Sequence, residues 1–342
     1  MKNNNIYYIL IALLVIGTII FWRYQSKNEA RQNKQQSETL DQQLPGINGV
    51  LVDEATAKQQ PIAVVIENHT NARPQSGLTD ADIVYETLAE GGITRFLALF
   101  QTRKPKEVGP VRSARPYFNF LANQWGAAYA HVGGSTIALS ELNSNIYKQL
   151  IDLNQFFYGD YFYRSKDRPA PHNAYTTIEL MRELLTKKKT DNWVPVKFGD
   201  FAITPTDQLQ TQTTEITTKF FDANYASVFT YDPTTNSYKR TNGGKIATDK
   251  NNGLQIAPMN VLVQFVEDYL VPLETTTGLG LHLEKSGRAI LFNNGVATTG
   301  NWRYNNGTTS YTGPEDQPMK FTPGQIWIIL MPKSLTNQVT WK

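Results

Sequence analysis

The sequence predicts an α/β or α+β N-terminal domain followed by a mainly antiparallel β domain, with a transmembrane helix at the N-terminus. Three observations support this fold class. Apolar runs of strand length alternate with segments of helical spacing over residues 47–202. From residue 220 onward the pattern is mostly extended and is broken by Asn-Gly and Gly-rich turns. Residues 6–22 form an apolar run without charges.

Four strands are expected in the N-terminal domain. Residues 62–66, "IAVVI", form a continuous apolar run of the length of a buried strand. The runs "IVYETL" (83–88) and "ITRFLALFQ" (93–101) are separated by a short Ala-Glu-Gly-Gly turn, so we expect them to pair as a hairpin. A fourth short strand is predicted at 127–132, "AAYAHV".

Three helices are expected between these strands and the end of the domain. Apolar side chains recur at helical spacing over residues 117–127, 136–150 and 178–189. Ser113 is the predicted N-cap of the first helix, with Pro116 in its first turn, and Ser135 is placed to cap the second.

The pattern of the C-terminal part predicts a set of strands and hairpins. Residues 203–219 are rich in Thr and Gln, which indicates a linker or an exposed strand. The strand and hairpin segments beyond it lie at 227–244, 260–270, 288–304 and 324–332. We interpret 220–342 as a mainly β domain whose strands pair in an antiparallel set.

Two tryptophans of this part, Trp302 and Trp327, lie on or near predicted strands. Buried, they belong to the core; exposed, they would offer surfaces for stacking on sugar rings. We favour the core position.

The composition excludes several classes of function. The chain has no cysteine, which removes disulfides, thiolate nucleophiles, zinc–thiolate sites and lipid attachment through cysteine. Charged residues make up 18% of the chain and the net charge is +3. That balance is not typical of a protein that binds nucleic acid through a broad basic surface, and we predict no nucleic-acid partner.

The N-terminus indicates attachment to the cell membrane. We divide it into a cytoplasmic tip (1–5), a transmembrane anchor (6–22) and a polar stalk (23–46). A cleaved signal peptide is the alternative, but the apolar run is long for one and no small-x-small cleavage site follows. Basic residues after the run would favour a cytoplasmic domain, although long domains translocate despite such charges.

The segment "GPVRSARPY", residues 109–117, places two arginines between two prolines and ahead of a predicted helix. Free N–H groups at a helix N-terminus favour an anion, and guanidinium groups match phosphate or carboxylate. The structural alternative is that Arg112 and Arg115 pair with internal acids such as Asp82, Glu86 or Glu90. Both interpretations stay open at this stage.

Other polar motifs follow predicted strands or lie in Pro-rich loops, so they are expected to gather at one edge of the sheet. The turn "HVGGS" connects a strand to a helix, "ENHTNAR" follows the first strand, and "YRSKDRPAPHN" is too Pro-rich for a helix. The candidate ligand-binding residues are Glu67, His69, Arg73, Arg112, Ser113, Arg115, His131, Gly133, Gly134, Ser135, Arg164, Arg168, His172 and Asn173.

The three histidines of this region share no local metal-binding spacing, and no nucleophile elbow is present. We therefore predict no metal site and no cofactor. The more common role of such histidines is to hold loops by hydrogen bonds.

Several motifs, taken in order, resemble the YerB-like family of bacterial lipoproteins. They are "IAVVIENHTNARPQSGLTDADIVYETLAEGGITRFLALFQ", "GPVRSARPYF", "AHVGGS", "RPAPHNAY" and the closing "GNWRY…TPGQIWIILMPK". The resemblance covers most of residues 47–335 and implies an outward-facing envelope protein of a Gram-positive bacterium, but no particular activity. The family commonly carries a lipid-bearing cysteine. Because this chain has none, we expect a helical anchor in its place.

A looser likeness connects residues 81–135, from "ADIVYET" to "AAYAHVGGS", to the LytR–CpsA–Psr cell-wall phosphotransferases, in which arginines hold a polyprenyl pyrophosphate. Where that family has Pro-Arg-Asp, this chain has Val111, Arg112 and Ser113. The change removes a carboxylate that would help to hold Mg²⁺. The likeness thus implies an anion pocket without turnover.

We therefore expect a membrane-anchored extracytoplasmic protein that binds an anionic ligand of the cell envelope or acts as an accessory factor. One alternative is a phosphotransferase or hydrolase of cell-wall polymer precursors, with Glu67, Asp82 or His131 as acid, base or metal ligand. The other is a protein-interaction scaffold that uses residues 220–342. The sequence names neither the ligand nor a protein partner.

Overall fold

The computed structural model describes residues 17–18, 21–28, 43–190, 193–205, 208–209, 211–272 and 277–342. The chain divides into two compact units, Met1–Leu44 and Pro45–Lys342. In the first unit, residues 17–18 and 21–28 are helical. Within the described ranges, no helix combines the length and the apolar character needed to cross a membrane. The predicted tip at 1–5 and most of the predicted anchor and stalk lie outside these ranges.

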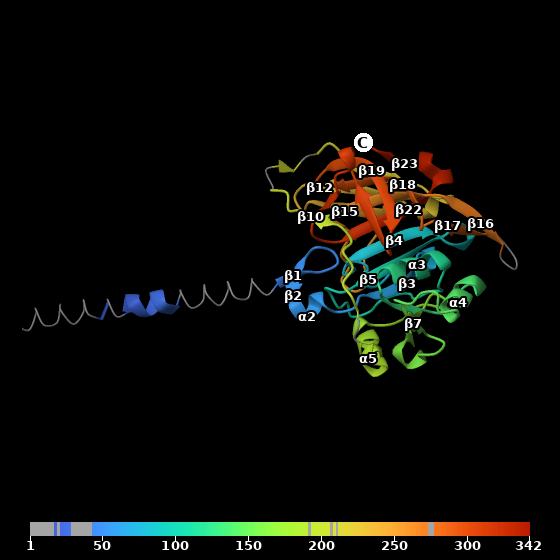
Figure 1. The fold of residues 1–342 in the computed structure, drawn as a ribbon, viewed down its shortest axis with the longest axis horizontal. Helices are drawn as coiled ribbons and strands as arrows, with labels where there is room; N and C mark the ends of the chain where they lie inside the picture. Colours follow the sequence, from blue (N-terminus) through green and yellow to red (C-terminus); the bar gives the residue numbers. More distant parts are fainter. Residues whose placement is uncertain are drawn as a thin grey trace, which may run out of the picture. The chain divides into compact units, whose positions relative to one another are not determined.

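The second unit is built on a ten-stranded mixed sheet (Figure 1). Its strands, in spatial order, are β20 (Thr308–Thr312), β19 (Val296–Asn305), β18 (Ser286–Asn293), β15 (Asn260–Val266), β22 (Ile326–Pro332), β4 (Ile83–Leu88), β5 (Thr94–Phe100), β3 (Ile62–Glu67), β6 (Ala128–His131) and β7 (Ile151–Asn154).

The middle of this sheet joins the two segments that we expected to form separate domains. In Figure 1 the red and orange C-terminal strands meet the blue and cyan strands where β22 lies beside β4. Strand β22 runs parallel to both neighbours, with Ile326 opposite Ile83 on β4 and opposite Asn260 on β15. The expectation that this strand completes an antiparallel set is therefore wrong. A domain boundary at 203–219 stays a prediction, although residues on both sides of it contribute to one sheet.

Helices cover part of the sheet. The described α-helices of this unit are α2 (Glu54–Ala57), α3 (Pro116–Gln124), α4 (Thr136–Asn143) and α5 (Ile178–Lys188). Short 3₁₀ turns lie at η1 (Thr70–Ala72), η2 (Glu90–Gly92), η3 (Gly159–Tyr161), η5 (Ala223–Tyr225), η6 (Pro314–Asp316) and η7 (Lys333–Gln338).

The helix caps agree with the sequence at one position and differ at another. Ser135 is the N-cap of α4, and its hydroxyl accepts a hydrogen bond from the backbone N–H of Ala138 at 3.3 Å. Helix α3, in contrast, has Arg115 as its N-cap and no side-chain cap. The prediction that Ser113 caps this helix is wrong, because the backbone stays extended as far as Arg115, with φ −138° and ψ 151°.

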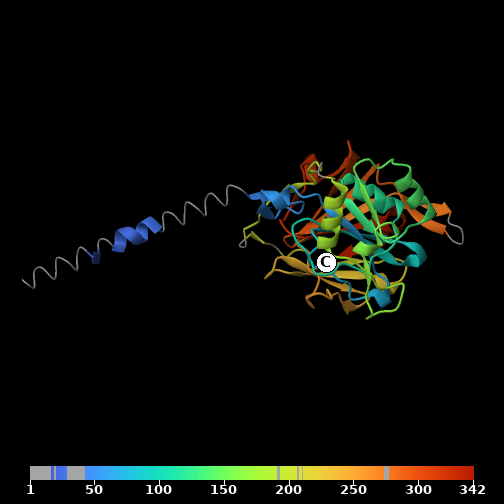
Figure 2. The same cartoon turned by 90° about the horizontal axis from the view of Figure 1, so that it is seen from below.

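A second, five-stranded sheet packs near the first. Its strands, in spatial order, are β14 (Lys245–Ile246), β13 (Ser237–Asn242), β12 (Ser227–Asp232), β11 (Glu215–Thr218) and β23 (Val339–Trp341). Figure 2 shows its yellow and pale-orange strands on a different side of the unit from the green helices. The remaining short strands are β1 (Gln43–Pro45), β2 (Leu51–Asp53), β8 (Tyr163–Arg164), β9 (Ala174–Tyr175), β10 (Asp200–Phe201), β16 (Asp268–Pro272), β17 (Thr277–Leu281) and β21 (Lys320–Phe321).

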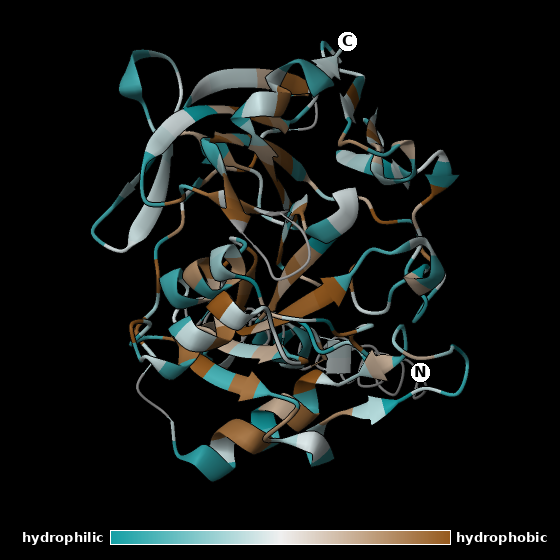
Figure 3. Ribbon diagram, turned by 90° about the vertical axis from the view of Figure 1, so that its right-hand side faces the viewer, coloured by the Kyte–Doolittle hydropathy of each residue, from teal (hydrophilic) through white to brown (hydrophobic). Residues whose placement is uncertain are grey.

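The central strands β3, β4, β5, β15 and β22 are buried on both faces of the ten-stranded sheet. Successive side chains of a strand point to opposite faces, so each of these strands contributes to two cores. Val64 and Ile66 of β3 belong to a core that includes residues of α5 and of the smaller sheet. Ala63 and Val65 belong to a second core that includes residues of α3 and α4. A strand covered on both sides is apolar throughout, as "IAVVI" is. Figure 3 shows this as brown strands inside and teal segments outside.

The two tryptophans lie in these cores, as we favoured. Trp302 and Trp327 are 1% and 0% exposed. The indole N–H of Trp302 donates to the carbonyl of Phe265 at 2.9 Å, and that of Trp327 donates to Glu86 at 2.9 Å. Neither ring is available for stacking on a ligand.

Candidate functional site

The segment "GPVRSARPY" lies between the end of β3 and the turn that follows β6. The backbone N–H of Arg112 donates to Val65 at 2.9 Å, and the carbonyl of Arg112 accepts from Val132 at 3.0 Å. Further along, the N–H of Ala114 donates to Gly133 at 3.0 Å. The structure therefore brings together the three motifs that follow β3, β5 and β6. Gly133 has φ +57°, a backbone conformation that disfavours any residue with a side chain, and a Cβ on it would also displace the exposed ring of Phe156, 2.9 Å away.

The two arginines of this segment contact different acids. Nε of Arg112 lies 3.2 Å from Oε1 of Glu67, whereas the guanidinium of Arg115 donates to Glu90. An extended chain points residues separated by an odd number of positions to opposite sides. Arg112 and Arg115 therefore point to different sides and do not form one wall. Of the acids named as alternatives, Glu90 is thus the partner of Arg115.

A loop cluster forms around Glu67, His69, Arg112 and His172. The carboxylate of Glu67, whose side chain is 5% exposed, lies 3.0 Å from Nδ1 of His172 as well as beside Arg112. The ring of His69 stacks on that of His172 at a centroid distance of 4.7 Å. Ligand binding by this loop cluster stays a prediction.

Four other candidate residues fasten loops to one another. Arg168 donates to the carbonyls of Ala72 and Pro74, and Arg164 donates to Oδ1 of Asn173 at 2.8 Å. Arg73 donates to Asn68 at 3.0 Å and to the carbonyl of Asn224 at 2.9 Å. Burial and the nearby charge of Arg240 lower the pKa of Arg73 to about 10. Arg73 and Arg168 thus each direct several N–H donors to other groups of the protein.

The residues named as acid, base or metal ligand for the enzymatic alternative contact different groups of the protein. His131 is fully buried, with Nδ1 2.7 Å from the carbonyl of Gly133 and Nε2 2.8 Å from Oδ1 of Asp152, so it holds the glycine turn. Asp82 is 1% exposed and accepts hydrogen bonds from a neighbouring loop. Among the described residues, no group of three or more His, Asp or Glu side chains is arranged to hold a metal ion.

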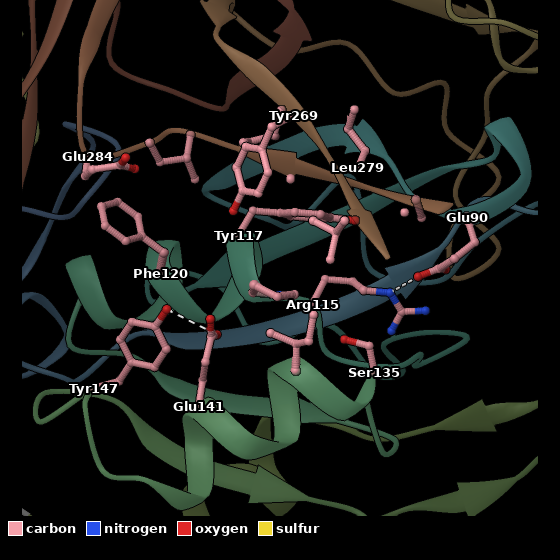
Figure 4. A pocket seen from close by; sticks show the side chains of 18 residues that line it. Glu90, Arg115, Tyr117, Phe120, Ser135, Glu141, Tyr147, Tyr269, Leu279 and Glu284 are labelled. Carbon is pink, nitrogen blue, oxygen red and sulfur yellow. Dashed lines mark hydrogen bonds and ion pairs between the residues drawn. The ribbon is translucent and has the colours of Figure 1, made fainter. Parts of the chain in front are cut away.

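A cavity of about 340 Å³ lies beside Arg115, and we call it the Arg115 pocket (Figure 4). Its walls come from α3, from α4, from the η2 turn and from the hairpin of β16 and β17. Arg115, Glu90 and Ser135 line one end, on the right of Figure 4. The hydroxyl of Ser135 caps α4 and faces the same space. The pocket thus contains two of the predicted site residues.

At the Arg115 end of the pocket, the carboxylate of Glu90 is shared by Arg115, which lines the cavity, and by Arg95, which is buried behind it. Glu90 contacts Arg115 through Oε1 and lies 3.5 Å from Arg95 through Oε2, so two guanidinium groups share one carboxylate. Arg95 is 7% exposed, and burial together with the charge of Arg115 lowers its pKa to about 10. An arginine fork with incomplete compensation is suited to bind a phosphate or carboxylate group.

This arrangement predicts how stability depends on pH. Burial alone would raise the pKa of Glu90, but the hydrogen bond from Arg115 and the charges of both arginines outweigh it and lower the pKa below 4.5. A carboxyl with a lowered pKa stabilises the fold above its unfolded pKa, and this contribution is lost as pH falls through the folded value. Unfolding by urea at pH 7 and at pH 3 should therefore show a smaller fall in stability for Glu90→Gln than for wild type.

A Glu183→Gln variant is the control, because Glu183 forms an exposed pair with Lys187 on α5. Its fall between the two pH values should match that of wild type. An equal fall for Glu90→Gln and wild type would show that the two arginines do not lower the pKa of Glu90.

Sequence reasoning missed much of this pocket. Residues 260–270 read as one strand, but β15 ends at Val266 and β16 pairs with β17 in a separate hairpin. That hairpin and the strand end after it supply Tyr269, Leu279 and Glu284. The only local signal was the pair of charged residues that interrupts the apolar run before Tyr269.

The chain matches two family models over most of its length. Residues 47–191 match "Protein of unknown function (DUF3048) N-terminal domain", and residues 216–328 match the C-terminal domain of the same name. Among curated proteins, "Putative lipoprotein YerB" of Bacillus subtilis (strain 168) is 32% identical over 289 residues, which cover 84% of this chain and 85% of that protein.

A solved structure agrees with this match. The crystal structure of the YerB protein from Bacillus subtilis superposes with a TM-score of 0.77 at 29% identity, covering 87% of this chain and 99% of that one. The comparisons do not bear out the likeness to the LytR–CpsA–Psr phosphotransferases. Agreement of sequence, domain order and fold shows that this chain belongs to the DUF3048 family of YerB-like proteins.

Proposed function

We propose that this protein is attached to the cell membrane, faces the outside of the cell, and binds an anionic envelope ligand in the Arg115 pocket. Two findings support the location: the apolar run at 6–22 and a relative whose name describes a lipoprotein. Because the chain has no cysteine, its attachment would depend on residues 6–22 and not on a lipid.

The observation that carries the ligand proposal is the charge imbalance at Arg115. Arg115 lines the cavity and shares its carboxylate partner, Glu90, with the buried guanidinium of Arg95. In the loop cluster, by comparison, Arg112 contacts Glu67, which also contacts His172. Outside that cluster, Arg164 and Arg168 donate to uncharged groups of the protein. A phosphate or carboxylate bound at Arg115 would supply a second negative charge for the two guanidinium groups that share Glu90.

Calorimetric titration with butyl phosphate tests this proposal on the full chain in detergent. We expect wild type to bind it and Arg115→Gln to bind at least tenfold more weakly, which corresponds to about 1.4 kcal/mol. Arg103→Gln is the matched control, because Arg103 is 64% exposed and pairs with Asp80 outside the pocket. Absence of binding to wild type, or equal binding by Arg115→Gln, would contradict the proposal.

A further inference from the structure

The end of the pocket that lies away from Arg115 is lined by acidic and aromatic side chains. Glu141 of α4 and Glu284, which follows β17, line it together with the rings of Phe120, Tyr147 and Tyr269. Figure 4 shows these five side chains on the left, away from Arg115 and Ser135. We call this set the acidic end of the pocket.

We propose that the acidic end binds an organic ammonium group, so that the ligand is a zwitterion with its anionic group at Arg115. This inference rests on the proposed function, because it takes the ligand of the same pocket and adds its second charged group. A carboxylate pair beside aromatic faces is the chemistry that recognises amines and quaternary ammonium ions.

The contacts of Glu141 are the first observation that supports the ammonium site. Its carboxylate accepts from Nδ2 of Asn119 at 3.1 Å and from the hydroxyl of Tyr147 at 3.2 Å. Among the described residues, it forms no ion pair with a lysine, arginine or histidine. Burial raises the pKa of Glu141 in spite of these two hydrogen bonds. The protein thus keeps a half-buried carboxylate without a cation at the wall of a cavity, and an ammonium group would stabilise its charge.

Glu284 lines the same pocket as Glu141. Its Oε1 is 2.7 Å from Nδ1 of His282. The ring of His282 packs against that of Tyr269, with 4.6 Å between the ring centroids. Burial first, and then the charges of Glu284 and Glu141, raise the pKa of Tyr269. Both carboxylates are therefore near the same tyrosine, whose ring lines the pocket in Figure 4.

The aromatic rings give the ammonium group a second kind of contact. The ring of Phe120 packs against that of Tyr304, with 4.9 Å between the ring centroids, and this contact holds Phe120 at the acidic end. Tyr147 is held by its hydrogen bond to Glu141. A cation over the face of such a ring gains about 0.5–1 kcal/mol at exposed sites and more where water is excluded. The pocket, at about 340 Å³, is large enough for a small chain that joins the two charges.

Paired ligands separate this inference from the function on which it rests. Each of 4-aminobutyl phosphate and 6-aminohexyl phosphate is titrated beside its amine-free counterpart, butyl or hexyl phosphate, so that both reach and charge are varied. For wild type, we expect the amine of at least one pair to raise the affinity tenfold or more.

Variants then locate the amine. Glu141→Gln and Glu284→Gln keep the side-chain shape, and we expect each to reduce the amine's advantage at least threefold while affinity for the alkyl phosphates stays within twofold. Glu183→Gln, on the exposed face of α5, is the control and should bind all four compounds as wild type does. Thermal unfolding of each variant verifies that it is folded.

Each outcome bears either on the zwitterion inference or on the proposed function. If the alkyl phosphates bind and the amine adds nothing at either length, the zwitterion inference is overturned and the proposed function stands. If the amine's advantage survives in both glutamate variants, the inference is also overturned, because the amine is bound elsewhere. If no alkyl phosphate binds to wild type, the proposed function itself fails.

Discussion

Glu86→Gln is expected to lower the free energy of unfolding by about 3–5 kcal/mol, because it leaves a buried guanidinium without its counter-charge. The side chains of Arg240 and Glu86 are 2% and 0% exposed, and one guanidinium nitrogen of Arg240 lies 3.1 Å from each carboxylate oxygen. Glu86 also accepts from the indole of Trp327 at 2.9 Å. The guanidinium carbon lies 4.7 Å from the centre of that indole ring, so it has little access to water.

This ion pair connects distant parts of the chain. Glu86 belongs to β4, Arg240 to β13 and Trp327 to β22, so its loss weakens the contact between the two family segments and both sheets. The experiment is urea unfolding of Glu86→Gln and Glu183→Gln side by side. The exposed Glu183 pair should contribute no more than about 0.5 kcal/mol. Equal stability of the two variants would contradict the prediction.

Replacing both partners is a further check. Buried pairs replaced by apolar residues are often neutral or even stabilised. In Glu86→Leu/Arg240→Leu, however, Trp327 and Thr94 would lose the acceptor that Glu86 provides. Each such unmet buried donor costs about 1–3 kcal/mol. We therefore expect the double variant to recover only part of the loss.

Local patterns were sufficient for the central strands and for most helices. The hairpin of β4 and β5 follows from two apolar runs and a short Gly-containing turn, and the structure confirms it with Ile83 opposite Leu99. Ser135 as a cap follows from its position before an apolar helix. These predictions succeed because each depends on neighbours in sequence.

Pairing between distant strands could not be predicted in the same way. Strand β22 lies beside β4 although the chain between them holds most of the protein, and a parallel pair leaves no turn to mark it. The apolar run of β22 fits a central strand in either direction. Its buried Trp327 depends on Glu86, a partner that no local pattern indicates.

The candidate site was predicted as a region more accurately than as a set of contacts. The motifs after β3 and β6 meet because these parallel strands end at the same edge of the sheet. Strand β5 is antiparallel to β3, and the chain after it returns to this edge, where Val111 pairs with Ile66. The interpretation in which Arg112 and Arg115 bind one anion depended on a helix capped by Ser113, whereas the extended backbone up to Arg115 turns Arg112 to the other side. The acidic end depends on the hairpin of β16 and β17, whose break from β15 the apolar run concealed.

Asp82→Ala should remove about 3 kcal/mol or more of stability, because several buried donors converge on its carboxylate. Asp82 accepts from the backbone N–H of Gln101 at 2.6 Å and of Thr102 at 2.9 Å, and also from the Thr102 hydroxyl. Nδ2 of Asn48 donates to it at 2.7 Å, which fastens the N-terminal segment of the unit. An alanine leaves these donors buried without an acceptor.

Asp80→Ala is the matched control in the same loop. The side chain of Asp80 is 28% exposed and lies 3.7 Å from Arg103, so we expect its removal to cost less than about 1 kcal/mol. Urea unfolding measures both variants, and hydrogen exchange should quicken at the amides of Gln101 and Thr102 in Asp82→Ala alone. Similar stability of the two variants would contradict this account. A carboxylate that is 1% exposed and surrounded by donors serves the fold, so its loss is expected to act on stability and not on ligand affinity.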